Sequence, residues 1–409
     1  MKILVVSHAA ATFGESKGGA DVLALRHAVF LSHGFGDVEY VGTLASTDSG
    51  TLTHVAVRDS DLLAYDRLGS RGAEVGYLLN HFVRAVKAAL VANREFRRYR
   101  PDLVITHTSL ATIILKVLHR RTPLVYQIHD GLFVHRTVRT LGKRLVRFLM
   151  NDLLELAAVR RADHILCVSS SIYAQLVGAG VPPEKLSVVP YLPPRVEVQE
   201  ARRGKEAASS FALSVSPFIL SVGQQTGRKR FDLLIEAMQF TTSPLHLVIV
   251  GDGPLQGPYT VLRDRLGLGA RVHLQRSVSD VELAGLYSHA TAFFLVSTNE
   301  GLPITVSEAE SYGCRSVFFC PNIQTTTDYR KDLAQVVDRI PTAREIAQFM
   351  DDACGGSPGE KAEADLRRAE AASGAGADQA YGAMQSLYRS VFRRVLNLRS
   401  DVEGASRAS

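Results

Sequence analysis

The sequence has few of the features that mark secreted, metal-binding or membrane-spanning proteins. Its 409 residues include four cysteines whose spacings match no metal-ligand motif, and so few thiols in a long chain are typical of a reducing compartment. No run approaches the roughly 18 apolar residues of a membrane span. The first ten residues lack the long apolar core of a signal peptide. We therefore expect a cytoplasmic protein.

Charge of either sign is not concentrated, since the net charge of +6 is spread along the chain. This excess favours anionic ligands or an anionic surface, but it is too diffuse to indicate a nucleic-acid partner. A basic amphipathic segment at residues 136–161 could lie on a membrane, although such segments are more often the solvated face of a surface helix. Contact with a membrane surface is therefore not favoured.

Apolar runs and helical periodicity alternate in two series, which predicts two α/β domains. With 46% hydrophobic and 22% charged residues, the chain has the core for two domains of about 100–200 residues each. Such series fold as doubly wound parallel sheets. We predict domains at 1–195 and 217–375, joined by a linker at 196–216. The strands are expected at 2–6, 38–41, 101–107, 123–128, 163–168 and 185–189, around an irregular insertion at 44–70, and then at 218–222, 245–250, 271–274 and 292–296.

Two carboxylates, Glu300 and Glu308, follow the strand expected at 292–296. Gly301 breaks the strand, and Pro303 suits the first position of a helix. In a parallel α/β sheet, ligands bind at the carboxyl ends of the strands, where helix N-termini favour anions. A carboxylate pair at that edge can accept hydrogen bonds from the hydroxyls of a polyol. The alternative is a pair of exposed glutamates that the helix macrodipole favours.

A basic, glycine-containing loop follows the first strand of the second series. Gly223 begins the loop, and Arg228 and Lys229 end it before the next helix. Backbone amides and cations in that position could bind a diphosphate, although a solvated basic loop is the alternative. The next strand ends in a second glycine turn that contains Gly251 and Gly253. Both loops are expected at the edge of the sheet that bears Glu300.

The first series carries weaker candidates at its own strand ends. Gly18 and Gly19 open a helix after the first strand, so their amides could approach a phosphate, although a tight turn is the alternative. Their spacing is not that of the dinucleotide fingerprint, which is therefore not supported. His107 and His129 each end a strand, and for either one alone a structural histidine is the alternative. Because both are expected at the edge where ligands bind, His129 is a candidate for a site role.

Taken in order and spacing, these motifs resemble the retaining, GT-B-fold glycosyltransferases of family four, the glycogen-synthase-like group. The resemblance spans the chain to about residue 320. It implies two Rossmann-like domains that face each other across a cleft, with a terminal helix at 376–396 that crosses back to the first domain. The residues that carry it are 219–223, Lys229, 231–237, 248–254 and Glu300-x7-Glu308-Ala309.

The resemblance also implies roles for individual residues. His129 would lie beside the donor sugar and Glu300 would hold its hydroxyls, so these two residues are the expected catalytic pair. Glu308 would contact the nucleotide ribose and Lys229 the diphosphate. The family requires neither a metal nor a cofactor. The expected donor-binding residues are Gly18, Gly19, Gly223, Arg228, Lys229, Gly251, Gly253, Gly301, Leu302, Pro303 and Glu308.

The chain departs from the family pattern at two positions near the expected diphosphate and nucleobase. Gln224 stands where the family usually carries arginine, and a neutral amide cannot pair with a diphosphate as a cation does. Arg228 or Arg230 could replace the missing charge. Arg276 stands where the family has glycine, which leaves the preferred nucleobase open.

Together with the resemblance, these observations predict transfer of a sugar, with retention of configuration and without a metal, from a nucleoside-diphosphate donor to an acceptor hydroxyl or another nucleophile. Glycans, lipids and small natural products are all candidate acceptors. The alternatives are a GT-B-fold epimerase or phosphorylase, or a degenerate protein that binds nucleotide sugars without catalysis.

Overall fold

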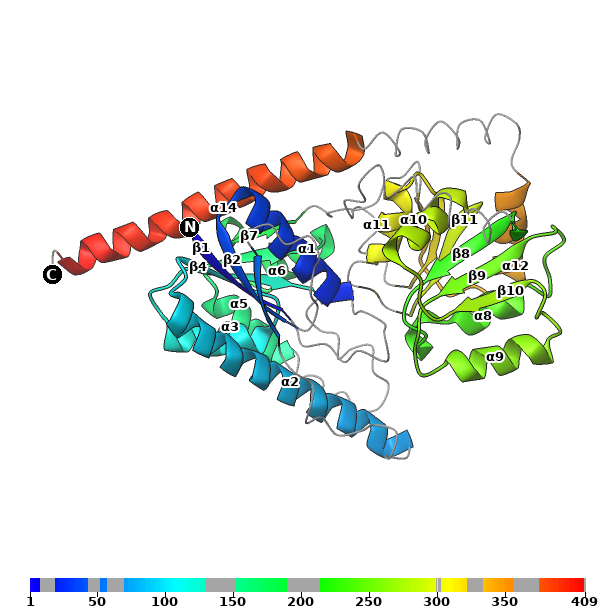
Figure 1. Cartoon of the computed structure of the whole chain (residues 1–409), viewed down its shortest axis with the longest axis horizontal. Helices are drawn as coiled ribbons and strands as arrows, with labels where there is room; N and C mark the ends of the chain where they lie inside the picture. Colours follow the sequence, from blue (N-terminus) through cyan, green and yellow to red (C-terminus); the bar gives the residue numbers. More distant parts are fainter. Residues whose placement is uncertain are drawn as a thin grey trace. The chain divides into compact units, whose positions relative to one another are not determined.

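The structure is a computed structural model of the chain, and two compact units are described in it (Figure 1). The described residues are 1–7, 19–42, 52–56, 70–129, 152–189, 214–298, 300, 303–321, 334–355 and 375–407. Unit 1 contains the described residues up to Val189 and the last helix from Gly382 onward. Unit 2 contains the described residues from Ser214 to Tyr381. Within this part of the chain, no helix is long and apolar enough to cross a membrane.

Unit 1 is built on a seven-stranded parallel sheet with the order β3-β2-β1-β4-β5-β6-β7. Every residue of β4, β5 and β6 is buried, as expected for parallel strands covered on both faces. The strands are β1 (Lys2–Val6), β2 (Asp37–Gly42), β3 (Leu52–Ala56), β4 (Leu103–Thr106), β5 (Leu124–Ile128), β6 (His164–Cys167) and β7 (Leu186–Val188).

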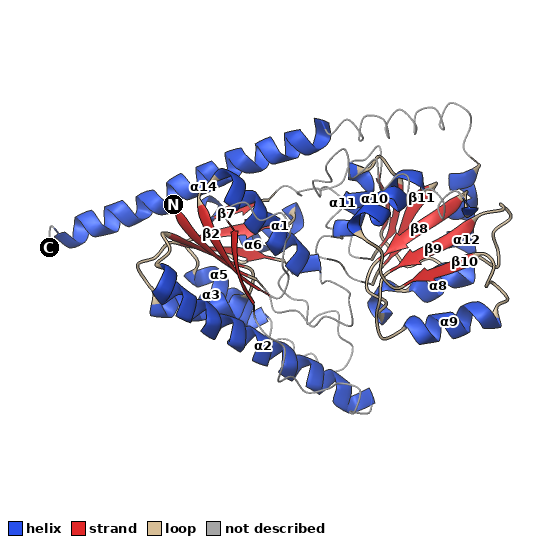
Figure 2. Ribbon diagram, in the orientation of Figure 1, coloured by secondary structure: helices blue, strands red, loops and turns tan. Residues whose placement is uncertain are grey.

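Helices cover both faces of this sheet (Figure 2). On one face, α3 (Ser109–Leu118) packs between α2 (Ser70–Tyr99) and α5 (Leu153–Arg161). On the other face, α14 (Ala375–Arg407) packs against α1 (Gly19–Gly34). The rings of Tyr388 and Phe392 on α14 contact Phe35 at centroid distances of 6.0 and 5.3 Å. The helix α6 (Ser170–Gly178) begins at Ser169, whose hydroxyl accepts from the Ile172 amide.

Unit 2 is built on a six-stranded parallel sheet with the order β10-β9-β8-β11-β12-β13. The central strands β8 and β11 are buried at every position, which explains their continuous apolar sequences. The strands are β8 (Phe218–Val222), β9 (His246–Val250), β10 (Val272–Gln275), β11 (Ala292–Val296), β12 (Ser316–Phe319) and β13 (Ala334–Val337).

Two groups of helices enclose the unit 2 sheet. The helices α8 (Phe231–Ala237), α9 (Gln256–Arg265) and α12 (Ala343–Cys354) share one core cluster with one face of the sheet. The helices α10 (Asp280–His289) and α11 (Ile304–Ser311) share a second cluster with the other face. Capping boxes at Ser279–Glu282 and Thr342–Glu345 fix the starts of α10 and α12.

Two local predictions are wrong. The segment 44–70 is not irregular throughout, because Leu52–Ala56 forms β3 and pairs with β2 at the edge of the sheet. This strand is only five residues long and includes polar residues, so its sequence signal is weak. Pro303 is the N-cap of α11 and not its first residue, with φ −73° and ψ 90°. The predicted segments 136–151 and 196–213 lie outside the described residues.

Candidate functional site

The candidate site lies in unit 2 at the carboxyl ends of β8 and β11. These two strands are neighbours in the sheet, but the chain leaves them in opposite directions, to β9 on one side and to β12 on the other. In open α/β sheets, such a reversal of strand order leaves a crevice in which ligands bind. Gly223 follows β8 and Glu300 follows β11, so both loops meet at this point.

The central feature of the site is a carboxylate held by two cations. Lys229 Nζ donates to Glu300 Oε1 at 2.7 Å, and Arg228 Nη1 donates to Glu300 Oε2 at 2.8 Å. The side chains of Lys229 and Glu300 are 8% and 6% exposed, whereas that of Arg228 is 48% exposed. The Thr298 amide also donates to the Arg228 carbonyl at 3.0 Å. The loops after β8 and β11 are therefore joined by ionic and backbone contacts.

The surroundings of Glu300 keep it ionised. Burial alone would raise the pKa of Glu300, but the charges of Lys229 and Arg228 outweigh burial and lower the pKa to about 2. Burial lowers the pKa of Lys229, and the Glu300 carboxylate acts in the opposite direction. At neutral pH, Glu300 therefore accepts hydrogen bonds and does not donate them.

The loop after β9 fits tightly against the loop after β8. A Cβ on Gly251, which has φ +138°, would lie 2.1 Å from the Gly223 carbonyl oxygen. A Cβ on Gly253 would lie 2.5 Å from the Gln225 carbonyl oxygen. The Gln225 amide donates to the Asp252 carbonyl at 2.9 Å, and the Gln225 side-chain amide donates to the Gly251 carbonyl at 2.6 Å. Glycine is required at 251 and 253 because backbone atoms of the loop after β8 occupy the space that a side chain would fill.

Glu308 belongs to a separate contact on α11. The hydroxyl of Tyr287 on α10 donates to Glu308 Oε2 at 3.1 Å, and the Tyr287 ring stacks on Tyr312 with an interplanar angle of 7°. Sequence reasoning missed Tyr287 because it lies within the helical pattern of α10, where an aromatic residue is typical of the core. Gln225 was missed as well, because the family pattern drew attention to its neighbour Gln224, and nothing in the sequence indicates the contacts that Gln225 makes with the loop after β9.

The remaining basic residues near the site have other partners. Arg230 has φ +43°, and its guanidinium makes three hydrogen bonds of 2.8 to 3.1 Å to the carboxylate of Asp232, at the start of α8. Arg276 donates to Gln256 Oε1 at 2.5 Å. Of the three cations at 228–230, Arg228 and Lys229 contact Glu300, and Arg230 contacts Asp232.

Unit 1 places His129 in a separate group of histidines at the carboxyl edge of its own sheet. His129 Nε2 lies 2.9 Å from His107 Nδ1, and His27 Nδ1 lies 2.7 Å from Gln127 Oε1. Burial, with a smaller effect from His27, lowers the pKa of His129 to about 3. Burial lowers the pKa of His27 to about 4. Both imidazoles are therefore neutral at physiological pH, and His129 can act there as a hydrogen-bonding group.

The structure thus unites part of the predicted site. Gly223, Arg228, Lys229, Gly251, Gly253 and Glu300 lie in three adjoining loops of unit 2. Glu308 and Pro303 lie on and before α11, and Gly19 is the first residue of α1. Gly18, Gly301 and Leu302 lie outside the described residues.

Comparison with known proteins gives two family models that match the chain in tandem. The model described as Glycosyltransferase Family 4 matches residues 45–191, and the model described as Glycosyl transferases group 1 matches residues 204–320. The chain is also 31% identical over 159 residues to a lipopolysaccharide 1,6-galactosyltransferase of Salmonella typhimurium. That match covers 37% of the chain and 41% of the relative's length.

Solved structures share the fold across nearly the whole chain. A sucrose-phosphate synthase from Thermosynechococcus elongatus has a TM-score of 0.71 at 17% identity, and the match covers 96% of this chain and 99% of the other. The Anabaena HepE protein, solved in complex with UDP-glucose, has a TM-score of 0.62 at 15% identity, with 100% of both chains covered.

Two parallel α/β units in tandem, matched along nearly the whole chain by these solved structures, have the GT-B fold. Within that class, the chain carries in tandem the two domains of the family-four type, as the two family models show. The family resemblance seen in the sequence is confirmed, and so is the predicted α/β fold class.

Proposed function

We propose that this protein transfers a hexosyl group from a nucleoside-diphosphate donor to a hydroxyl of a glycan acceptor, with retention of configuration and without a metal. The observation that carries the proposal is the Lys229–Glu300–Arg228 cluster at the carboxyl ends of β8 and β11. Cations at this edge suit a diphosphate, and a carboxylate suits sugar hydroxyls.

In the proposed reaction, the bond between the anomeric carbon and the diphosphate oxygen breaks. The acceptor oxygen forms the new bond on the same face of the sugar, and the acceptor proton passes to the departing diphosphate. Breaking the bond to the anomeric carbon makes negative charge grow on the diphosphate, where Lys229 and Arg228 would stabilise it. The N-terminus of α11, which follows Pro303, would add favourable backbone amides.

The other predicted residues have supporting parts in this proposal. Glu308, held by Tyr287, would accept hydrogen bonds from the ribose hydroxyls. Neutral His129 would contact the donor sugar, and Gly18 and Gly19 would approach the diphosphate. Gly301 and Leu302 would contribute backbone groups next to Glu300. The close packing at Gly223, Gly251 and Gly253 keeps the loops that carry the cations in place.

Arg228 is the residue that would replace the cation missing at Gln224. It is half exposed and already contacts Glu300, so its guanidinium can reach a ligand beside that carboxylate. Arg230 makes three hydrogen bonds to Asp232 and would have to leave them to reach the same ligand. A bidentate guanidinium is also better suited than an amide to bind a diphosphate.

A charge-relocation experiment tests this assignment. We expect Arg228→Gln to weaken donor binding at least tenfold, which corresponds to about 1.4 kcal/mol. Arg230→Gln, the matched control, should change affinity less than twofold. The double variant Gln224→Arg/Arg228→Gln should recover most of the lost affinity, because it returns one cation to the loop. Calorimetric titration with UDP and UDP-sugars measures all three, and equal losses in Arg228→Gln and Arg230→Gln would contradict the assignment.

The activity itself is tested with a panel of nucleotide sugars, starting with UDP-sugars because HepE was solved with UDP-glucose. Slow release of nucleoside diphosphate from one donor, abolished in Lys229→Ala, supports the transferase. Epimerised sugar nucleotide or sugar phosphate as the product would instead indicate an epimerase or a phosphorylase. Binding without turnover in the presence of glycan acceptors would indicate a degenerate binding protein.

A further inference from the structure

Unit 1 has an open pocket at the amino ends of β4 and β5, the edge of the sheet opposite to the histidine group. Its volume is about 450 Å³, within the range of roughly 300–1,000 Å³ that is typical of small-molecule sites. Strand β4, about 13 Å long, separates the pocket from His107. We call it the amino-edge pocket, and its lining residues are Phe96, Arg97, Arg100, Pro101, Asp102, His119 and Thr122.

Two arginines of the pocket have no partner within the part of the chain that the structure describes. Arg97 and Arg100 are exposed, and neither guanidinium makes a hydrogen bond or an ion pair with a described residue. Arg98, which lies between them in the sequence, donates to Glu39 Oε2 at 2.6 Å and to Glu95 Oε2 at 2.5 Å. The nearby glutamates therefore hold Arg98, and the two pocket arginines are available to a ligand.

Arg100 also has a backbone conformation that arginine rarely adopts. Its φ is +50°, and its amide donates to the Phe96 carbonyl at 2.9 Å where α2 ends. Glycine is the usual residue at such a helix end, because a Cβ strains the left-handed conformation. A cation beside a helix C-terminus is favourable, but Arg97 and Arg98 in the last turn already supply that charge. Strain of this kind is typical of functional positions, and here it places a guanidinium at the pocket.

The other lining residues supply a hydrogen-bond acceptor and a rigid ring surface. Asp102 is exposed, and its Oδ2 accepts from the Lys2 amide at 2.8 Å, which fixes the carboxylate and leaves Oδ1 available as an acceptor. The Phe96 ring stacks on the His119 ring at a centroid distance of 3.6 Å and an interplanar angle of 16°. His119 Nε2 lies 2.9 Å from Asn93 Oδ1, a contact that holds the imidazole in place.

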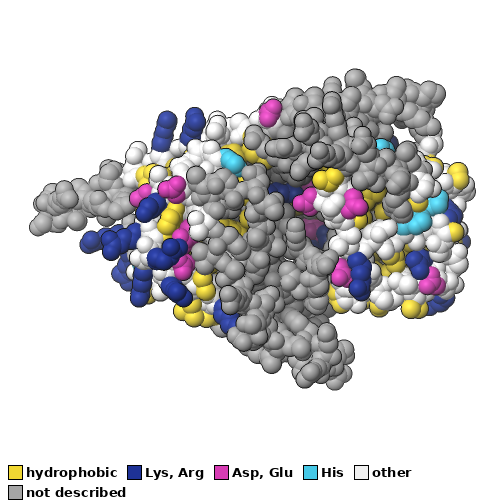
Figure 3. Space-filling view, viewed as in Figure 1, with side chains coloured by type: hydrophobic (Ala, Val, Ile, Leu, Met, Phe, Trp, Pro, Cys, Tyr) yellow, Lys and Arg dark blue, Asp and Glu magenta, His cyan; other side chains and the backbone are white. Residues whose placement is uncertain are grey.

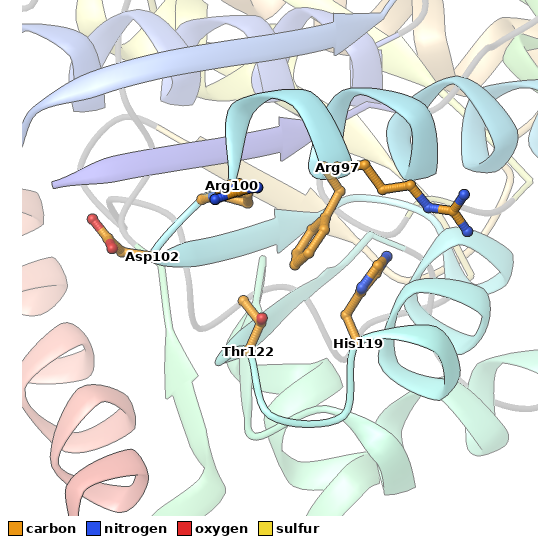
Figure 4. A pocket seen from close by; sticks show the side chains of 7 residues that line it. Arg97, Arg100, Asp102, His119 and Thr122 are labelled. Atoms are coloured by element: carbon orange, nitrogen blue, oxygen red, sulfur yellow. The ribbon is translucent and has the colours of Figure 1, made fainter.

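The charged groups lie at different places around the pocket. Figure 4 shows Arg97 and His119 at one end and Asp102 at the other, with Arg100 and Thr122 between them. A ligand that contacts both ends therefore carries an anionic group and, at a distance from it, hydrogen-bond donors. Figure 3 shows basic and acidic side chains near one another on the described surface of unit 1, so the overall charge of this surface does not select the ligand.

We propose that the amino-edge pocket binds an acidic sugar residue, one that bears a carboxylate or a phosphate as well as free hydroxyls. Arg97 and Arg100 bind the anionic group, and Asp102 accepts hydrogen bonds from the hydroxyls. The stacked rings of Phe96 and His119 pack against the apolar face of the sugar. A bare anion leaves Asp102 without a role. The proposal concerns binding alone and does not depend on the proposed transferase activity.

Calorimetric titration of the full chain with simple sugars tests the proposal. We expect galacturonate or galactose 6-phosphate to bind about tenfold more tightly than galactose, because hydrogen bonds to a charged group are the stronger ones. Saturating UDP should not displace the acidic sugar, since the pocket contains none of the proposed donor-binding residues. Displacement by UDP would assign the probe to the donor site and overturn the proposal.

Substitutions of the arginines test the pocket itself. Arg97→Gln and Arg100→Gln should each lower the affinity for the acidic sugar about tenfold. Arg94→Gln, the matched control, changes an exposed arginine of α2 that does not line the pocket and should leave the affinity unchanged. Arg100→Gly should lose affinity and yet be at least as stable as the wild type, because glycine relieves the left-handed conformation. Loss of binding without loss of stability excludes misfolding as its cause.

Asp102→Asn distinguishes a sugar from a bare anion. This substitution should weaken binding of the acidic sugar and not that of sulfate, which has no hydroxyl to donate to Asp102. Titration with UMP tests a nucleotide as the ligand, and circular dichroism identifies any variant that fails to fold. The proposal is overturned if acidic and neutral sugars bind equally, if sulfate or UMP binds as tightly as the acidic sugar, or if the folded Arg97→Gln and Arg100→Gln variants bind it as the wild type does.

Discussion

At the scale of single residues, Glu300 couples folding to the chemistry of the site. Its carboxylate lies between a buried ammonium and a half-exposed guanidinium, and nearly all of its surface is buried. A buried ion pair contributes little net stability, but removing one partner leaves the other charge buried and unpaired. Glu300 is therefore constrained by Lys229 even when no donor is bound.

We expect Glu300→Gln to lower the free energy of unfolding by about 3–5 kcal/mol at pH 7, because buried Lys229 loses its counter-charge. Asp232→Asn is the matched control, since its pair with Arg230 is about one third exposed on both sides and should contribute far less. Denaturant unfolding at pH 7 measures both variants, and equal losses would contradict the role assigned to burial.

The lowered pKa of Glu300 also predicts that the protein loses stability in acid. The folded-state pKa of Glu300 is lowered from 4.5 to about 2, so its contribution is fully present above pH 4.5 and is lost as the pH falls toward 2. Between pH 4.5 and 2, the free energy of unfolding of the wild type should therefore fall more steeply with decreasing pH than that of Glu300→Gln. If the free energy of unfolding falls equally steeply with pH in the two proteins, the lowered pKa is contradicted.

At the scale of elements, the loops after β8 and β9 depend on glycine for their contact. Gly251→Ala should destabilise the protein by more than about 1 kcal/mol, because the new methyl group meets the Gly223 carbonyl and φ is +138°. Gly257→Ala is a control of opposite sign: its Cβ would meet nothing within 4 Å in α9, so a gain of up to about 1 kcal/mol is expected. Thermal unfolding of the two variants compares the signs directly.

The elements also show how far the sequence determines the site. Strands such as Phe218–Val222 and Ala292–Val296 were predictable because buried parallel strands are continuous apolar runs. The spacing of Glu300 and Glu308 placed one residue in a loop and the other on a helix, as observed. The different partners of Arg228 and Arg230 were not predictable, because they depend on the left-handed conformation of Arg230 and on the contact of its side chain with Asp232.

At the scale of the whole molecule, unit 1 is completed by a helix from the far end of the chain. Tyr388 on α14 is fully buried, contacts the Phe30 and Phe35 rings, and places its hydroxyl 3.4 Å from His27 Nδ1. The helix α14 thus supplies part of the core of a unit whose other elements end before residue 190.

Tyr388→Ala should therefore lower the stability of unit 1 by about 3–5 kcal/mol, as expected for loss of a large buried aromatic side chain. Tyr388→Phe keeps the ring and loses only the hydroxyl, so a cost of no more than about 1.5 kcal/mol is expected. Hydrogen exchange measured over α1 and β1 locates the effect. Loss of protection confined to unit 2 would contradict this assignment of α14.

The discontinuous construction of unit 1 also sets an order of events during synthesis. The ribosome makes residues 1–189 first and α14 only after all of unit 2. Until α14 emerges, Phe30 and Phe35 have no Tyr388 or Phe392 to cover them. Unit 2 can close as soon as its own residues have emerged, whereas unit 1 waits for the end of the chain. A nascent chain arrested before α14 should consequently be the form that chaperones bind and proteases attack.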